Sequence, residues 1–236
     1  MTLYHPSIEM LTDYAAGSLP LAHSLCVSAH LEHCRECQQQ VRKLEMVGSH
    51  LFDQAETDHH HLNSLKESLL KKLTIQTESK QDEEVLQATT EPKTTEEKFW
   101  DNYKIPNSLR QFISNSYEEL NWMRLSPSFK IATLHNEKGG AQIALTRVKA
   151  GSHMPHHAHT GEEITLVLEG AFSDESGVYR KGDFISRDAS HKHKPIVTKD
   201  AECICLTVLD APIEFTGWLA RLLNPIIRRY HPYSGA

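Results

Sequence analysis

The stretch His30-Leu-Glu-His33-Cys34-Arg-Glu-Cys37 has the residue types and the spacing of a metal site. Cys34 and Cys37 are three positions apart, so at the start of a helix both thiols can turn toward one ion, and His30 lies one helical turn earlier. Tetrahedral zinc is bound by such a set, with thiolate sulfur at about 2.3 Å and imidazole nitrogen at about 2.0–2.1 Å. These three ligands lie close together in the chain, so the sequence predicts a fourth ligand from another segment.

The helices expected ahead of this stretch indicate where the fourth ligand lies. Pro6 favours the first turn of a helix with an apolar stripe, and a second helix begins at Pro20 and reaches His30. In an antiparallel hairpin of two arms of about ten residues, each ~15 Å long, the start of the first arm lies beside the end of the second. That arrangement puts His5 next to His30. Cys26 is the alternative, because it lies one turn from His30 on the same face. With His5, the set is a closed structural site that stabilises a small helical unit.

These N-terminal residues resemble a known family. The segments His5-Pro6-Ser7, Tyr14-Ala15-Ala16-Gly17, Ser24-Leu25 and His30-x3-Cys34-x2-Cys37 together resemble the N-terminal zinc anti-sigma domain of the ChrR family. Members of that family carry a cupin-like second domain. The resemblance therefore implies a second, β-rich half with a metal site of its own.

A second group of candidate metal ligands lies in the C-terminal half. The run Gly151-x5-His157-x-His159-x3-Glu163-x6-Gly170 is followed by Gly182-x10-His193. His157 and His159 are two apart, so on a strand they point to the same face, while Glu163 returns after a turn and His193 arrives from another strand. Three imidazoles and one carboxylate suit zinc, manganese, iron, nickel or copper, so the ligands leave the metal open.

This second group resembles the first cupin motif at each defining position. The second motif keeps His193 but has Asp188 and Ser190 where the motif usually has proline and glycine, a departure that affects a turn rather than a ligand. The resemblance implies zinc in this site too, and hence two zinc ions per chain.

The elements that must position these residues change character along the chain. Residues 1–76 have helical periodicity, and residues 99–236 contain short segments that alternate with period two. Between them, residues 77–98 carry seven acidic residues and three lysines with few apolar ones. That stretch cannot repay the entropy of ordering, so we predict a flexible acidic linker that lets two domains move independently.

The strands are expected at 129–135, 141–149, 162–169, 178–185, 193–198 and 202–209. Many short strands at regular spacing favour a sandwich or barrel. The expected fold class is therefore α + β multidomain. A small all-α zinc-binding domain is followed by an all-β barrel, which the resemblance implies is a cupin (a double-stranded β-helix or jelly roll).

Three features leave alternatives open. A helix begun by Asp58 carries leucines along one side, which are either core or a surface that awaits a partner. Cys203 and Cys205 share a face of a strand, where they are either small apolar residues or an oxidant-reactive redox pair, a role that the resemblance keeps open. The tail, residues 212–229, either packs on the barrel or mediates self-association.

Composition narrows the classes of function. The chain has 236 residues, a net charge of −6 and no basic stripe, which argues against direct nucleic-acid binding. With no signal peptide and no run of 18 apolar residues, we expect a cytoplasmic protein without a membrane role. Five cysteines, an odd number, fit a reducing compartment better than a disulfide framework.

The resemblance implies a specific function. It implies an anti-sigma factor rather than an enzyme, whose zinc-bound N-terminal domain binds an extracytoplasmic-function sigma factor and blocks it from RNA polymerase. The cupin domain would then be required for release under oxidative stress of the singlet-oxygen or peroxide type. One alternative is a cupin metalloenzyme of the dioxygenase type with an accessory zinc domain, because a cupin fold does not settle function. A metal-storage or metal-sensing protein is the other.

Overall fold

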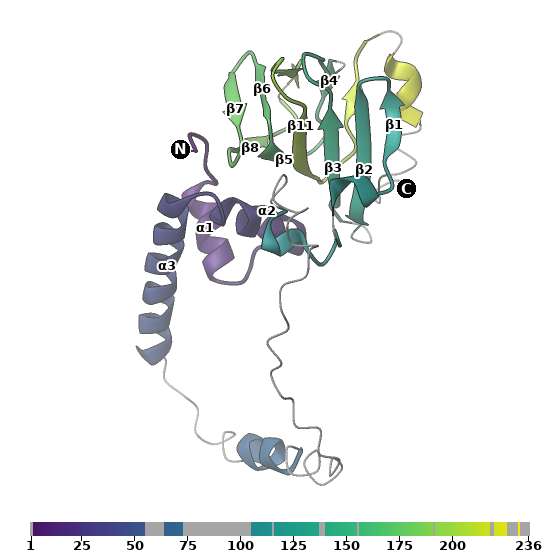
Figure 1. Ribbon diagram of the computed structural model, residues 1–236. Coiled ribbons are helices and arrows are strands. Elements are labelled where there is room, and N and C mark those ends of the chain that lie inside the picture. The colour runs from purple at the N-terminus through teal and green to yellow at the C-terminus, as the bar shows by residue number, and fades with distance from the viewer. Residues whose placement is uncertain are drawn as a thin grey trace, which may run out of the picture.

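The structure is a computed structural model, and it describes residues 2–54, 64–72, 105–114, 116–136, 140–154, 156–190, 192–217, 220–225 and 231. The N-terminal part contains the helices α1 (Ile8–Ala15), α2 (Leu21–Leu31) and α3 (Arg35–Gln54), and residues 64–72 are also helical. The remainder is built from β-strands and short 3-10 helices (Figure 1). The predicted α + β architecture is confirmed, while the predicted linker at 77–98 lies outside the described residues.

The helices α1 and α2 form the hairpin expected from the sequence. Ser7 caps α1, because its Oγ accepts a hydrogen bond from the amide of Met10 at 3.2 Å. We had predicted that Pro6 lies within the first turn of this helix. It lies instead just before the capping residue. A turn at residues 32–34 leads directly from α2 into α3, which places Cys34 at the start of that helix.

The described residues of the β half form three antiparallel sheets. The largest has the strand order β1-β2-β3-β11-β5-β8, and the smaller ones have the orders β10-β6-β7 and β12-β4-β9. The strands of the large sheet are β1 (Met123–Ser126), β2 (Phe129–Asn136), β3 (Gln142–Val148), β5 (Glu163–Glu169), β8 (Phe184–Arg187) and β11 (Cys203–Leu209). The others are β4 (His157–Ala158), β6 (Ala171–Asp174), β7 (Gly177–Arg180), β9 (Lys192–His193), β10 (Ile196–Val197) and β12 (Glu214–Phe215). The 3-10 helices are η3 (Asn107–Leu109), η4 (Tyr117–Glu119) and η5 (Ala220–Leu223).

The strand predictions are confirmed where the alternating pattern is long. The segments 129–135, 141–149, 162–169 and 202–209 correspond to β2, β3, β5 and β11. The segment 178–185 is instead split into β7 and β8, because Gly182 adopts φ +91° and turns the chain. The segment 193–198 is likewise split, into β9 and β10, and the short strands β1, β4, β6 and β12 were not predicted.

The strand β11 is buried on both faces, and its two faces serve different cores. Ile204, Leu206 and Val208 belong to a core that includes helical residues, whereas Cys203 and Cys205 belong to the core inside the β half. This division follows from the alternation of side chains along a strand. A strand that is apolar at nearly every position therefore needs cover on both sides.

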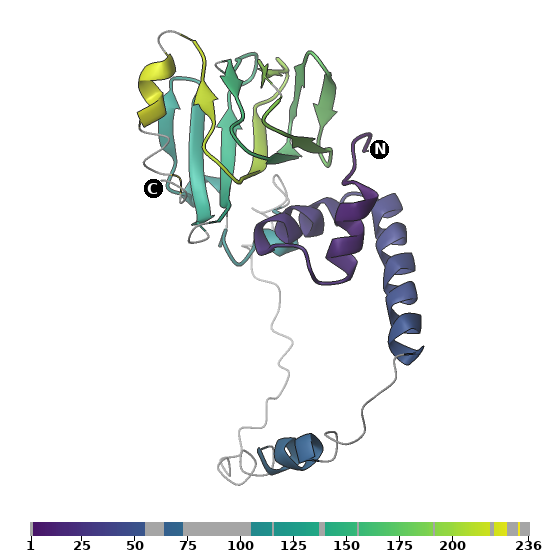
Figure 2. The same ribbon diagram turned by 180° about the vertical axis from the view of Figure 1, so that it is seen from behind.

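That cover is supplied by α2, so the helical half and the β half share one core. Leu25, Val27 and Ala29 of α2 are buried in the same cluster as Ile164 and Leu166 of β5. In Figures 1 and 2, α2 lies beside the β half, whereas α3 extends away from it. We had expected two domains that move independently, but the described residues pack together. The domain boundaries themselves remain a prediction.

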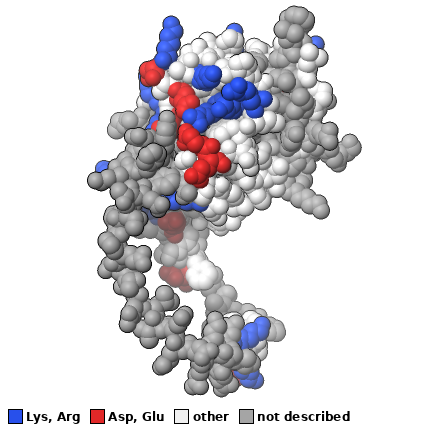
Figure 3. All heavy atoms as spheres, turned by 45° about the vertical axis from the view of Figure 1, so that its right-hand side comes forward, with Lys and Arg blue, Asp and Glu red and all other residues white. Residues whose placement is uncertain are grey.

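The described surface carries charges of both signs. Figure 3 shows acidic and basic side chains side by side on one face of the β half. Arg147, for example, pairs with Glu202 at 2.6 Å and with Glu118 at 3.2 Å. Within the described ranges, no helix combines the length and the apolar character that crossing a membrane requires.

Two glycines provide a matched test of this fold. Gly170 has φ +73°, and a Cβ there would collide with the carbonyl oxygen of Glu202, whereas a Cβ on Gly48 of α3 would meet open space. We expect Gly170→Ala to lower the free energy of unfolding by about 2 kcal/mol or more. Gly48→Ala should raise it by about 0.5–1 kcal/mol, because alanine favours a helix. Urea unfolding measures both changes, and equal stability of the two variants would contradict the described backbone at Gly170.

Candidate metal centres

The four predicted N-terminal ligands come together at one point. The ligand atoms of His5, His30, Cys34 and Cys37 all lie within 4.8 Å of one another. His5 Nδ1 is 3.4 Å from Cys34 Sγ and 3.5 Å from Cys37 Sγ, and His30 Nε2 is 3.3 Å from Cys37 Sγ. The hairpin of α1 and α2 brings His5 here, and the start of α3 supplies the thiols.

The donor set fits a tetrahedral zinc ion. At zinc bond lengths of about 2.3 Å to sulfur and 2.0–2.1 Å to nitrogen, tetrahedral angles separate sulfur from nitrogen by about 3.5 Å. The observed separations are 3.3–3.5 Å. Without a cation, burial and the neighbouring Cys34 thiol raise the pKa of Cys37 to about 12. A divalent ion offsets that cost, because the thiolate is the form that binds metal.

His30 is oriented by the β half. Its Nδ1 donates to the carbonyl oxygen of Gly182 at 2.8 Å, which leaves Nε2 free to face Cys37. A hydrogen bond from the second ring nitrogen is the usual way in which proteins fix a ligating histidine. Burial lowers the pKa of His30 to about 4, although the Gly182 carbonyl opposes this shift, so the ring is neutral near pH 7.

The alternative fourth ligand, Cys26, is not part of this group. Its side chain is fully buried in the shared core, and burial raises the pKa of its thiol. Cys26 therefore behaves as a small apolar residue.

The second predicted site brings three imidazoles together. His157 of β4, His159 and His193 of β9 have ligand atoms within 4.8 Å of one another. His193 Nε2 is 3.1 Å from His157 Nε2 and 3.2 Å from His159 Nε2. Nitrogen ligands at about 2.1 Å from one ion, at angles between 90° and 109°, are about 3.0–3.4 Å apart, so the triad fits a divalent metal.

Glu163, the predicted fourth ligand, lies beside this triad and outside the group. Its Oε2 is 2.8 Å from His159 Nδ1, and its Oε1 accepts a hydrogen bond from Thr165 at 2.8 Å. Burial alone would raise the pKa of Glu163, but the contacts with His159 and Thr165 outweigh it and lower the pKa to about 2. In this arrangement the carboxylate orients His159, and its role as a metal ligand remains a prediction. The neighbouring Glu162 is exposed.

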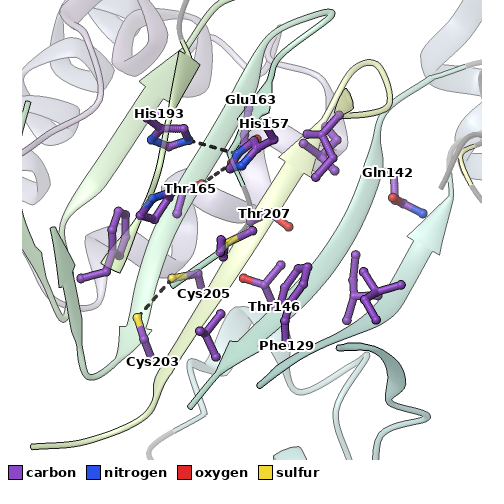
Figure 4. Close-up of a pocket in the computed structure, with 18 of the residues that line it drawn as sticks. Phe129, Gln142, Thr146, His157, Glu163, Thr165, His193, Cys203, Cys205 and Thr207 are labelled. Carbon is purple, nitrogen blue, oxygen red and sulfur yellow. Dashed lines mark hydrogen bonds between the residues drawn. The ribbon is translucent and has the colours of Figure 1, made fainter. Parts of the chain in front are cut away.

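A cavity of about 70 Å³ opens beside the triad. Its lining is mainly apolar, with His157, His193 and Glu163 at one end and Cys203, Cys205 and Thr207 along β11 (Figure 4). The two sulfur atoms are 3.6 Å apart. The neighbouring Cys203 thiol and burial raise the pKa of Cys205 well above its usual value. Because the thiolate is the reactive form, Cys205 is a poor nucleophile in this state.

Two functional carboxylates were missed by the sequence analysis. Asp174 Oδ2 accepts a hydrogen bond from His193 Nδ1 at 2.8 Å, and Asp183 Oδ1 accepts one from the amide of Leu3 at 2.7 Å. The Asp174-Glu-Ser-Gly177 turn was recognised from sequence, but a turn aspartate usually bonds only its own backbone. The sequence does hold a pattern that could have identified Asp183. The residue directly follows Gly182 in a tight turn, and its carboxylate accepts a hydrogen bond from the amide of Arg180 in that turn.

Comparison with known proteins gives three findings. Residues 110–211 match the family model described as ChrR Cupin-like domain. The anti-sigma-E factor ChrR of Cereibacter sphaeroides is 31% identical over 226 residues, which cover 95% of this chain and 98% of that protein. The crystal structure of Rhodobacter sphaeroides SigE in complex with the anti-sigma ChrR matches with a TM-score of 0.67 and 28% identity, over 89% of this chain and 100% of the matched chain.

The two metal groups predict the metal content of the purified chain. We expect about two divalent ions per chain, with Cys34→Ser losing one ion because three ligands cannot close a tetrahedral zinc site. Cys26→Ala removes a buried thiol of the same helical half and should keep both ions. Elemental analysis checks the counts. A Cys34→Ser protein that still holds both ions would contradict the assignment.

Proposed function

We propose an anti-sigma function for this chain, which belongs to the ChrR family. In this proposal, the zinc-holding helical half binds an extracytoplasmic-function sigma factor and keeps it from RNA polymerase, in the cytoplasm where both occur. The observation that carries the proposal is the likeness to an anti-sigma-E factor, which extends across both halves of the chain and covers 95% of this chain. No residue is assigned a catalytic role.

The surface of α3 supports a docking role for the helical half. Beyond Cys37 and Val41, the helix has no buried residue. Instead it exposes large apolar side chains, with Phe52 81% and Met46 72% accessible. Patches of this kind mark protein interaction sites, and an amphipathic helix commonly binds a partner along its apolar face.

The leucine-rich helix agrees with this interpretation. The sequence left open whether its leucines belong to a core or to a partner surface. The described ones are exposed, with Leu65 at 59%, Leu69 at 60% and Leu70 at 52%. These leucines therefore add to the exposed apolar surface that a partner could cover.

Charge reversal on α3 tests the docking surface. We expect the double variant Leu51→Glu and Phe52→Glu, in the full-length chain, to weaken sigma-factor binding about thirtyfold or more, because the loss of even one buried interface anchor costs about 2 kcal/mol or more. Leu222→Glu, at an apolar residue of η5 that is 73% exposed, is the control and should bind normally. Surface plasmon resonance with the cognate sigma factor provides the measurement. Equal weakening by the control variant would refute a specific α3 surface.

The interior of the β half supports a role in detecting an oxidant, and we propose that release of the sigma factor begins there. The cavity joins the histidine triad to oxidisable sulfur atoms in Cys203, Cys205 and Met154. A bound divalent metal would supply Lewis acidity toward a small oxygen-containing molecule. In this proposal the metal is zinc and the signal is singlet oxygen or a peroxide, as the family resemblance implies.

Histidine variants separate binding from release. We expect His157→Ala and His193→Ala to bind the sigma factor normally, because these residues lie on β4 and β9 of the β half, and to fail to release it during photosensitised singlet-oxygen exposure. His156→Ala changes an exposed histidine next to the same strand and should respond like the unaltered chain. Release is followed by fluorescence anisotropy of a labelled sigma factor. Constitutive release by His157→Ala would count against the assignment.

A further inference from the structure

One segment of the β half touches both candidate metal centres. The strands β6, β7 and β8 with their turns, residues 171–187, form the β6–β8 segment. We propose that this segment couples the two centres, so that a signal at the second centre that displaces Asp174 from Arg187 and Tyr179 loosens the N-terminal site through Tyr4. The inference deepens the anti-sigma function and rests on it, because it specifies how a signal in the β half reaches the helical half.

At one end of the path, Asp174 orients His193. The carboxylate is 1% exposed, and its Oδ2 accepts hydrogen bonds from His193 Nδ1 at 2.8 Å and from Arg187 Nη2 at 3.0 Å. Its Oδ1 accepts from the hydroxyl of Tyr179 at 3.1 Å, and Arg187 also donates to that hydroxyl at 2.6 Å. Asp174 bonds His193, Arg187 and Tyr179 at the same time. A rotation of His193 therefore disturbs Arg187 and Tyr179 as well.

In the middle of the path, Tyr179 contacts the N-terminal segment. Its ring centroid lies 4.6 Å from that of Tyr4, at an interplanar angle of 55°. Tyr4 packs against the core inside the β half although it precedes α1 in the chain. The Tyr4 hydroxyl also lies so close to Gly177 that a side chain there would displace it. Tyr4 is therefore inserted into the β6–β8 segment, and the next residue along the chain is the zinc-ligand candidate His5.

At the other end, the turn between β7 and β8 holds the backbone that precedes His5 and the side chain of His30. Asp183 Oδ1 accepts from the amides of Leu3 at 2.7 Å and Tyr4 at 3.3 Å, and the amide of Phe184 donates to the carbonyl oxygen of Tyr4 at 3.0 Å. The carbonyl oxygen of the adjacent Gly182 accepts from His30. Both histidines of the N-terminal group are thus positioned by this one turn. In Figures 1 and 2, the N-terminus accordingly lies beside this part of the β half.

The two states required for coupling follow from these contacts. In one state, Tyr4 is packed on Tyr179 and His5 closes the N-terminal group. In the other, Tyr4 has left its position and His5 no longer closes the group, so three ligands remain. A change that favours the second state must weaken N-terminal metal binding. The packing of Tyr4 and the binding of the metal are coupled, so each alters the equilibrium of the other by the same free energy. The positioning residues are therefore Tyr4, Tyr179 and Asp174.

Zinc loss from the full-length chain tests the coupling in the absence of any sigma factor. Zinc-loaded protein is mixed with a chromophoric chelator, and the phase that Cys34→Ser lacks is assigned to the N-terminal ion. We expect Asp174→Asn to accelerate this phase about tenfold, because Tyr179 and Tyr4 lose their support and the ligand His5 loses its position, and loss of such support typically costs about tenfold or more in metal binding. Glu175→Gln makes the same charge change at the next, exposed residue and should not alter the rate.

A double-variant comparison separates coupling from general destabilisation. Tyr4→Ala should accelerate the N-terminal phase as well, and Asp174→Asn should add nothing further in the Tyr4→Ala background, because the path is already cut. If Asp174→Asn does not fold, Tyr4→Ala alone must make the N-terminal rate independent of whether the second centre is loaded. Multiplying effects, or an unchanged rate in Asp174→Asn, would overturn the coupling alone. Absence of an N-terminal ion from the unaltered chain would overturn the coupling together with the zinc-based function.

Discussion

The two halves of the molecule depend on the buried imidazole of His30. Its Nδ1 is bonded to the Gly182 carbonyl oxygen and its Nε2 faces Cys37, so one ring is shared between a β-turn and a thiol cluster. A neutral imidazole has one donor and one acceptor, so the hydrogen bond to Gly182 also selects the nitrogen that is available to a metal. Both ring nitrogens of His30 have their partners only when three elements are in place together. These are the helical hairpin, the start of α3 and the turn after β7.

A shared apolar core also holds the helices on the sheet. The outward side chains of β5 and β11 are as apolar as the inward ones, and α2 supplies Leu25, Val27 and Ala29 to cover them. The helical half is thus stabilised partly by the β half. A signal that reaches the β half has direct contacts through which to act, and the long segment between the halves need not transmit it.

Much of the local chemistry could be predicted from the sequence, because it depends on short-range periodicity. The spacing of His30, Cys34 and Cys37 and the length of two helices were sufficient to bring His5 to the same point, and alternation located the long strands. Tertiary contacts could not be read in this way. Asp183 bonds an amide 180 positions away, and Asp174 bonds a histidine 19 positions away, and neither pairing leaves a periodic trace. For Glu163 the spacing identified the strand, but whether its oxygen atoms face a metal or His159 depends on side-chain geometry that no spacing encodes.

The exposed apolar end of α3 has a consequence for the lifetime of the protein. With Phe52 and Met46 largely accessible, a chain without its partner displays the kind of surface that chaperones and proteases recognise. A partner that covers α3 would remove this surface from view. The abundance of the chain in the cell would then follow the abundance of its partner, since surplus copies would be degraded first.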